Sequence, residues 1–397
     1  MAKKEQEERF PEDLIGQPVM TRVDHFAAKT FKHPMMDRAL DEVKAALHVY
    51  TPGLIVLLYG PNGVGKTTLC RLLQRDIINE AMPTLQEDPG IIPSAYVEVQ
   101  SPDRNFEWRD FYKDILRSLD EVLIDRKISF QTTSMYYDGG GNLVIREKAA
   151  KADLREAALS TLKHRKPTVI VDEAQHFGMV AGGRKLLDQM NCLKSLANRS
   201  KRPFVLAGTY ELLPFRNLNG QLSRRAIEVH FPRYRADVKI EREEFKDVLN
   251  TYQFKMPLVN EPDLVGQWEY IYEHTIGCVG VLNDWMLRAL HAALTEGKES
   301  LTRKHLKQTA PKRASCQKRL DEIIDGEVNV DRIEAEESLE LYRKRLGLVA
   351  CEAKGKIPER TSELQVEKKS SGSKRKNKNV GDRNTKRDAV GLQKLAG

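Results

Sequence analysis

The sequence predicts an α/β fold with a central parallel sheet flanked by helices, then a small all-α domain and a basic C-terminal tail. Short apolar runs, typical of strands buried on both faces, alternate with amphipathic helical segments up to about residue 235. Beyond that point the strand signal stops, and only helical spacing of apolar residues remains.

Four short apolar runs predict strands, and helical periodicity between them predicts the covering layers. The predicted strands are 54–59, 95–99, 168–171 and 204–208. The predicted helices of this part are 34–50, 69–78, 106–123, 149–162 and 186–198. Between them, residues 126–150 break the rhythm with a glycine-rich stretch, which predicts a β-hairpin insertion or a mobile loop.

These patterns divide the chain into five predicted parts. They are an N-terminal arm (1–30), an α/β nucleotide-binding domain (31–235, with the insertion at about 126–150), a helical lid domain (236–311), a charged helical extension (312–352) and a disordered basic tail (353–397).

The net charge of +8 is not spread over the chain. Residues 353–397 hold 13 Lys/Arg and 5 Asp/Glu, whereas residues 1–352 hold 52 of each kind and are neutral. The tail has no aromatic residue and too little apolar area to offset the entropy of ordering, so we expect it to be disordered. A solubilising tail and an electrostatic arm for DNA or an acidic partner are both open.

Cysteine spacing and hydropathy indicate the compartment. The five cysteines include no CxxC pair, which argues against a zinc site or a disulfide framework and is typical of reduced thiols. No apolar run reaches the ~20 residues of a membrane helix, and the N-terminus lacks a secretory signal. We therefore expect a cytoplasmic protein without a membrane partner.

A phosphate-binding loop follows the first predicted strand. The stretch Gly60, Pro61, Asn62, Gly63, Val64, Gly65, Lys66, Thr67 fits G-x-x-x-x-G-K-[ST], and Thr68 follows it. Glycines allow backbone N–H groups to approach phosphates closely, and the following helix directs its positive end at them. We expect Lys66 to reach the β- and γ-phosphates of ATP and the Thr67 hydroxyl to bind Mg²⁺.

A pair of carboxylates ends the third predicted strand. Asp172 is expected to hold Mg²⁺ through its water shell, and Glu173 to polarise the attacking water. His176 is placed either to couple the site to a neighbour or as an ordinary surface or capping residue. Together with the loop around Lys66, this pair predicts ATP hydrolysis.

Two further positions are candidates for the same chemistry. Thr209 follows the fourth predicted strand, where a polar side chain can sense the γ-phosphate. Arg224 and Arg225 come next, and one of them, supplied across a subunit boundary, can neutralise charge during phosphoryl transfer. A plain strand-ending turn and a basic helix end are the structural alternatives.

The series GPNGVGKT, VIVDEAQHF, FVLAGTYELL and GQLSRRAIEVHFPRY, in this order, resembles AAA+ P-loop ATPases and, more narrowly, the TnsC/TniB family of DNA transposition regulators. The resemblance runs from about Phe31 to Pro311. It implies Lys66 and Thr67 as the Walker A pair, Asp172 and Glu173 as the Walker B pair, Thr209 as first sensor, and Arg224 or Arg225 as arginine finger. It also implies an ATP-dependent homo-oligomer, ring-shaped or helical, on double-stranded DNA. Its further partners would be transposase subunits and a TniQ-like target-selection protein, with or without a CRISPR effector.

The sequence departs from the AAA+ pattern in two places. The gap from Lys66 to Asp172 is long, which agrees with an insertion at 126–150. In the helical domain, residues 277–280 offer no arginine where a second sensor is usual, and Arg288 lies two turns further on.

The sequence leaves the DNA contacts and the biological role open. Lys113, Lys127, Arg146 and Lys148 are candidate pore residues that would touch phosphates, although such a residue is more often a solvated surface charge. A scaffold ATPase that uses ATP for assembly and never binds DNA is the alternative, which the neutral body favours. A helicase or clamp loader is a third possibility, although residues after 310 do not have a winged-helix composition.

Overall fold

The computed structural model describes most of the chain. The described residues are 9–49, 51–101, 106–124, 135–137, 143–145, 151–178, 184–217 and 226–334, with 343, 346 and 348. The chain separates into two compact units, Met1–Ser338 and Leu339–Gly397. The predicted tail at 353–397 lies outside the described residues, and so does most of the predicted insertion. No helix in the described ranges is long and apolar enough to cross a membrane.

A five-stranded parallel sheet forms the centre of the first unit, in the order β2-β5-β6-β1-β7. Its strands are β1 Ile55–Tyr59, β2 Ser94–Glu98, β5 Thr168–Asp172, β6 Phe204–Gly208 and β7 Ala226–His230. Four of them are the predicted strands, and the predicted α/β fold is confirmed. The fifth, β7, does not follow from the sequence pattern, because this edge strand has only five residues, of which 227–230 alternate apolar with polar.

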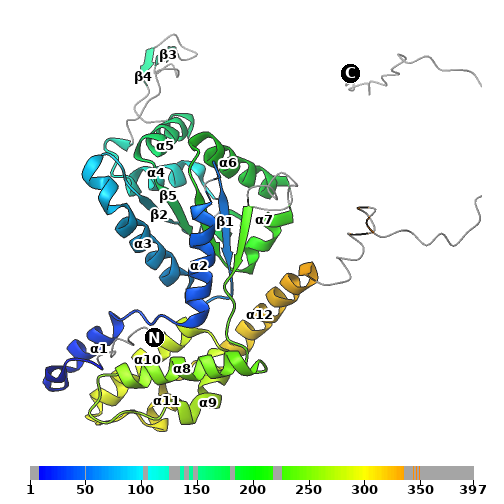
Figure 1. Ribbon diagram of the computed structural model, residues 1–397. Helices are drawn as coiled ribbons and strands as arrows, with labels where there is room; N and C mark the ends of the chain where they lie inside the picture. Colours follow the sequence, from blue (N-terminus) through cyan, green and yellow to red (C-terminus); the bar gives the residue numbers. More distant parts are fainter. Residues whose placement is uncertain are drawn as a thin grey trace, which may run out of the picture. The chain divides into compact units, whose positions relative to one another are not determined.

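Helices cover both faces of the sheet (Figure 1). Alternate residues of β1 point to opposite sides: Val56 and Leu58 belong to one core cluster, and Leu57 and Tyr59 to the other. The first cluster includes residues of α2 (Pro34–His48) and α3 (Lys66–Glu87), and the second includes residues of α4 (Trp108–Ser118), α5 (Lys151–Arg165) and α6 (Arg184–Ser200). The sheet therefore separates two apolar layers, as continuous apolar strands require.

A small ladder interrupts the connection between α4 and α5. Strands β3 (Met135–Tyr137) and β4 (Leu143–Ile145) pair antiparallel, with Met135 opposite Ile145 and Tyr137 opposite Leu143. The glycine-rich stretch lies between them in sequence, so of the two predicted forms the paired one is present.

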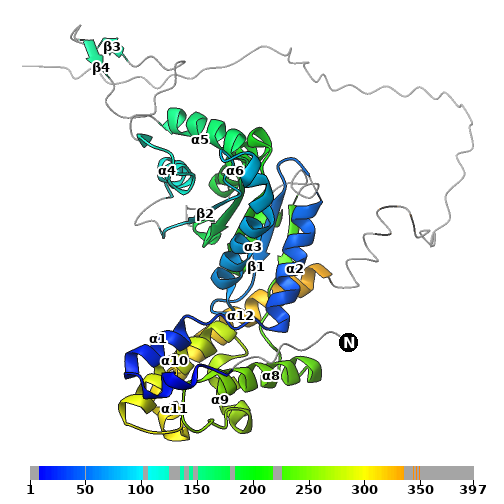
Figure 2. The same ribbon diagram turned by 60° about the vertical axis from the view of Figure 1, so that its left-hand side comes forward.

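A helical region gathers at the end of the sheet where β1 ends (Figures 1 and 2). Its helices are α8 Lys239–Lys255, α9 Trp268–Thr275, α10 Val279–Thr295 and α11 Arg303–Thr309. The N-terminal helix α1 (Val19–Ala27) packs on α10, and Arg22 donates to the carbonyl of Pro257. The segment predicted as an arm therefore contributes to the packing of the helical region.

Helix α12 (Arg313–Glu334) connects the helical region to the sheet domain. Near its start, Cys316 packs with Ile276 and Cys278. Further on, the Glu327 carboxylate accepts two hydrogen bonds from Arg233 (2.9 and 3.1 Å), just after β7. The short elements of the unit are η1 Glu12–Gly16, η3 Ala174–Gly178, η4 Tyr210–Leu212, α7 Leu213–Asn217 and η5 Val265–Gln267.

Candidate functional site

The glycine-rich loop lies between β1 and α3, in the strand–loop–helix context that phosphate binding requires. Gly63 and Gly65 have φ of 82° and 115°, values that side chains other than glycine rarely adopt. A Cβ on Gly60 would stand 2.0 Å from the carbonyl oxygen of Phe231. Glycine at this position therefore lets the loop pass close against the residue that follows β7.

The Lys66 side chain is buried at the start of α3, with 7% of its surface exposed. Its ammonium donates to the carbonyls of Gly60 (3.1 Å) and Pro61 (2.9 Å). Burial lowers the pKa of Lys66, and the nearby Glu173 and Asp172 carboxylates act in the opposite direction. A buried cation held by neutral carbonyls is well placed to bind an anion such as a polyphosphate.

Asp172 ends β5 and is 1% exposed. One carboxylate oxygen accepts from the Tyr96 hydroxyl (2.8 Å), and the other accepts from the Glu173 backbone N–H (2.9 Å). Burial and this hydrogen bond raise the pKa of Tyr96, so its hydroxyl remains a donor. Tyr96, on the neighbouring strand β2, therefore orients the carboxylate.

Glu173 and Thr209 are connected through Gln175, a residue that the sequence analysis did not identify. The Gln175 side-chain amide donates to the Glu173 carboxylate, and its carbonyl accepts from the Thr209 backbone N–H (3.3 Å). Glu173 itself has φ of 53°, which is unusual for a residue other than glycine. Gln175 is buried, whereas the Glu173 side chain that it holds is 37% exposed.

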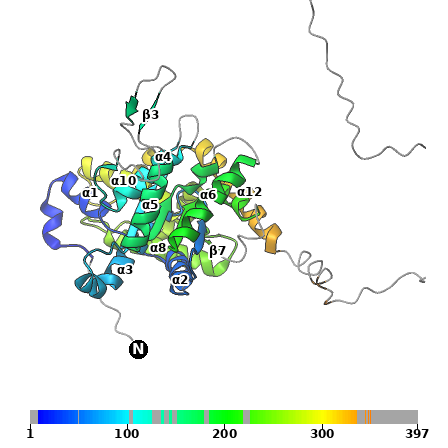
Figure 3. The ribbon, with the colours of Figure 1, turned by 90° about the horizontal axis from the view of Figure 1, so that it is seen from above.

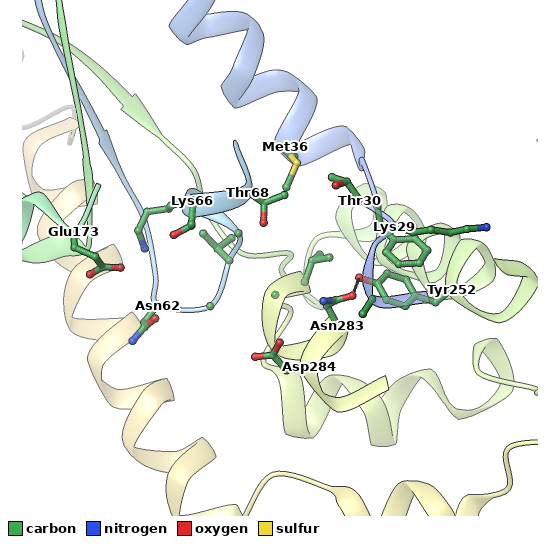
Figure 4. Close-up of a pocket in the computed structure, with 18 residues that line it drawn as sticks. Lys29, Thr30, Met36, Asn62, Lys66, Thr68, Glu173, Tyr252, Asn283 and Asp284 are labelled. Carbon is green, nitrogen blue, oxygen red and sulfur yellow. Dashed lines mark hydrogen bonds between the residues drawn. The ribbon is translucent and has the colours of Figure 1, made fainter. Parts of the chain in front are cut away.

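A cavity of about 340 Å³ opens between the glycine-rich loop, the segment after α1 and the helical region. Figure 4 shows Lys66 and Glu173 on one side of it, and Tyr252 and Asn283 on the other. Its volume falls in the range of small-molecule sites. The residues that line it are Ala27, Lys29, Thr30, Phe31, Met36, Asn62, Gly63, Val64, Gly65, Lys66, Thr67, Thr68, Glu173, Tyr252, Val279, Gly280, Asn283 and Asp284.

The far wall of the cavity is apolar and aromatic. The rings of Phe31 and Tyr252 stack with centroids 4.0 Å apart and an interplanar angle of 22°. The Tyr252 hydroxyl donates to Asn283 Oδ1 (3.2 Å), which leaves the Asn283 amide N–H groups to act as donors. These residues lie far apart in sequence, and no local pattern marked them as site residues.

The helical region meets the glycine-rich loop through backbone. The Val281 N–H donates to the carbonyl of Gly63 (3.1 Å), and a Cβ on Gly280 would lie 2.6 Å from the same oxygen. Arg288 is not among the residues that line the cavity. On this side the cavity is lined instead by the N-terminal part of α10, which includes Asn283 and Asp284.

Several predicted residues lie elsewhere or outside the described residues. Thr209 caps η4, where its hydroxyl accepts from the Glu211 N–H (3.4 Å), and it does not line the cavity. His176 Nε2 lies 4.0 Å from the Glu173 carboxylate. Lys113 is half-buried in α4. The predicted residues outside the described part are Arg224, Arg225, Lys127, Arg146 and Lys148.

Comparison with known proteins gives a family match for the part of the chain that contains the glycine-rich loop. Residues 50–215 match the family model described as "AAA domain". No curated protein matches the chain. The match covers β1, the glycine-rich loop, the Asp172–Glu173 pair and Thr209.

Solved structures that resemble this chain include three archaeal proteins. The ORC2 protein of Aeropyrum pernix is 15% identical, with a TM-score of 0.48 over 72% of this chain and 70% of that one. A Walker-type ATPase of Pyrococcus abyssi is 16% identical, with a TM-score of 0.45 over 77% of each chain. Cdc6p of Pyrobaculum aerophilum is 14% identical, with a TM-score of 0.47 over 75% of this chain and 70% of that one. Residues 50–215 of this chain therefore match an AAA domain, and their glycine-rich loop and parallel sheet have the arrangement of a P-loop NTPase fold.

Proposed function

We propose that this protein is an ATPase that oligomerises on double-stranded DNA and links target selection to a transposase. The observation that carries the ATPase part is the buried Lys66 ammonium, which faces a cavity also lined by Thr67 and Glu173. In this proposal Lys66 binds the β- and γ-phosphates, Glu173 orients the attacking water, and Gln175 holds the Glu173 carboxylate in place.

The nucleotide base fits the opposite wall. Phe31 and Tyr252 offer apolar and aromatic surface there, and Asn283 offers amide donors. The phosphates would then extend along the loop toward Lys66, and the first turn of α10 would cover them. This orientation makes the helical region a lid over the nucleotide.

The oxygen donors next to Lys66 fit magnesium. The cavity is lined by Thr67, and the Asp172 carboxylate, which is held by Tyr96 and the Glu173 N–H, is close enough to Lys66 to affect its pKa. No group of three or more His, Cys, Asp or Glu within the described ranges could hold a metal ion. In this proposal the ion is held chiefly by nucleotide phosphates and water, with Thr67 and Asp172 as the protein's contribution. Bound Mg²⁺ supplies positive charge to the β- and γ-phosphates during transfer.

The transposition part depends on the TnsC/TniB resemblance, chiefly on the segment from Gly208 to Tyr234. In this proposal Arg224 or Arg225 acts on the nucleotide of a neighbouring subunit, so hydrolysis requires assembly. Duplex DNA, transposase subunits and a TniQ-like protein are the proposed partners. The basic tail at 353–397 is proposed as an additional electrostatic contact.

Two substitutions test the ATPase part. Lys66→Ala should abolish ATP binding and assembly on DNA, because the other residues of the loop offer no charge to replace it. Glu173→Gln should keep ATP affinity but lower kcat by a factor of about 10² to 10⁴, the usual range for loss of a positioned base. ATP binding, turnover and sedimentation with a random-sequence duplex would be measured, with the exposed Glu87→Gln as control. ATP-dependent assembly that ignores DNA would support the scaffold alternative.

A further inference from the structure

Two equivalent helix-to-strand turns lie side by side at the edge of the sheet where β5 and β6 begin, opposite the nucleotide cavity. Helix α5 ends at Arg165 and leads through Lys166 into β5, and α6 ends at Ser200 and leads through Lys201 into β6. Val169 pairs with Phe204, so Lys166 and Lys201 each stand three residues before paired positions. Neighbouring strands lie about 4.8 Å apart, so the two turns are close neighbours. Figure 3 looks onto this edge, with α5 and α6 adjacent.

Arg202 joins the two turns. Arg202 belongs to the turn after α6, and its guanidinium donates to the carbonyls of Pro167 (2.9 Å) and Lys166 (2.5 Å) in the turn after α5. These bonds fix the relative position of the turns, while the Lys166 and Lys201 side chains stay exposed. The spacing of the two ammonium groups is therefore limited by the fold and by the length of the lysine side chains.

Both lysines occupy a backbone conformation that favours glycine. Lys166 has φ of 55° and Lys201 has φ of 57°, in the position after a helix where glycine is commonest. Within the described part of the chain, neither ammonium has a hydrogen bond or an ion pair. The backbone of both turns favours glycine, and the attraction between a lysine and the negative end of each helix offsets that conformational cost only in part.

The surroundings add positive charge. We call the six cations at these helix ends and turns the basic edge: Lys163, Arg165, Lys166, Arg199, Lys201 and Arg202. In the described part of the chain, Glu121 lies 4.0 Å from Arg165, and Glu156 lies 3.4 Å from Arg199. Residues 163–166 and 199–202 themselves contain six Lys/Arg and no Asp or Glu, in contrast to the even balance of residues 1–352.

We propose that the basic edge binds the phosphate backbone of duplex DNA. Paired cations at a constrained spacing suit a regular row of phosphates, and such contacts are independent of base sequence. The two turns, 163–167 and 199–203, contain no Phe, Tyr or Trp on which unpaired bases could stack, and their only ring besides the prolines is the imidazole of His164. This surface deepens the DNA-binding part of the proposed function, yet it lies across the sheet from Lys66 and does not require hydrolysis.

The test removes the two charges with a change that suits the backbone. Lys166→Gly with Lys201→Gly should leave the melting temperature unchanged or raise it, and should leave ATP turnover without DNA unchanged. The slope of log affinity against log salt for a random-sequence duplex should become less steep by about two units, roughly 0.9 for each lost phosphate contact. Lys166→Arg with Lys201→Arg should retain the wild-type slope.

A matched control removes two charges elsewhere. Lys298→Gln with Lys307→Gln neutralises two exposed lysines of the helical region and should leave the slope as in wild type. An unchanged slope in the glycine pair, or an equal change in the control pair, would overturn the proposal. So would a loss confined to single-stranded DNA or to an acidic peptide. If the wild-type protein lacks ATPase activity but Lys166→Gly with Lys201→Gly still makes the salt slope less steep, the proposed enzyme function is wrong and DNA binding by the basic edge is supported.

Discussion

Gly280 in the first turn of α10 lies against the carbonyl oxygen of Gly63 in the phosphate-binding loop. A Cβ on Gly280 would lie 2.6 Å from that oxygen, and a Cβ on Gly63 would meet the Val281 side chain at 2.6 Å. The neighbouring Val281 N–H donates to the same Gly63 oxygen at 3.1 Å. A movement of the loop would therefore be transmitted to the helical region through backbone contacts. Among the described residues, no arginine lines the cavity at this place.

We predict that Gly280→Ala weakens ATP binding by about tenfold, the equivalent of ~1.4 kcal/mol. Alanine favours helix by about 1 kcal/mol over glycine, so α10 itself should not suffer. The added methyl should instead push the helix off Gly63. Nucleotide affinity and hydrogen exchange of the Val281 amide would be measured.

Gly16→Ala is the matched control, since a Cβ there meets nothing within 4 Å. Wild-type affinity together with wild-type protection of the Val281 amide in Gly280→Ala would show that the contact does not position the lid.

Gln175→Ala should lower kcat by about 10²-fold while ATP affinity changes little. The substitution removes the bridge between the Glu173 carboxylate and the Thr209 N–H, and a small displacement of a catalytic group is that costly. Single-turnover hydrolysis and equilibrium ATP binding would separate the two effects. Gln175→Glu keeps an acceptor for Thr209 but repels Glu173, so it should also be slow; full activity in Gln175→Glu would exclude the bridge. The exposed Gln86→Ala is the control.

His33 should make the protein less stable in acid. Burial lowers its pKa from 6.5 to about 4, so the unfolded chain takes up this proton more readily than the folded one. The stability that the neutral ring provides is complete above pH 6.5 and is lost progressively as the pH falls from 6.5 toward 4, by at most about 3 kcal/mol.

His33→Asn should flatten this decline. Asparagine can still accept the Met36 N–H that His33 Nδ1 caps at the start of α2, but it does not titrate. Urea unfolding at several pH values would measure the slopes, with the exposed His48→Asn as control. Identical slopes in wild type and His33→Asn would contradict the prediction.

Glu327→Gln should destabilise the first unit by about 1 to 3 kcal/mol, because it leaves the Arg233 guanidinium without its carboxylate. The two side chains are 21% and 12% exposed, so solvent can replace the lost contact only in part. The Tyr272 hydroxyl would remain as a partner of Arg233 at 2.9 Å. Thermal unfolding would be compared with that of the exposed Glu322→Gln on the same helix. Equal melting temperatures would mean that α12 is held by its apolar contacts.

The sequence by itself determined the sheet strands with continuous apolar runs, the loop from Gly60 to Thr67, and the carboxylates that end β5. Each depends on neighbours in the chain: a buried strand needs an apolar run, and a phosphate loop needs glycines at set spacing. Strand β7 was not predicted, because an edge strand of five residues with alternating polarity resembles a loop.

Only the tertiary structure decided which distant residues complete the site. Gln175 lies between Glu173 and Thr209 because β5 and β6 are neighbours in the sheet. Phe31, Tyr252 and Asn283 form one wall because α8, α10 and the segment after α1 pack together. The same holds for Lys166 and Lys201, which the chain separates by a helix and a strand and the sheet register places side by side. Such contacts leave no periodic signal, since they arise from packing between elements and not from the order of residues within one.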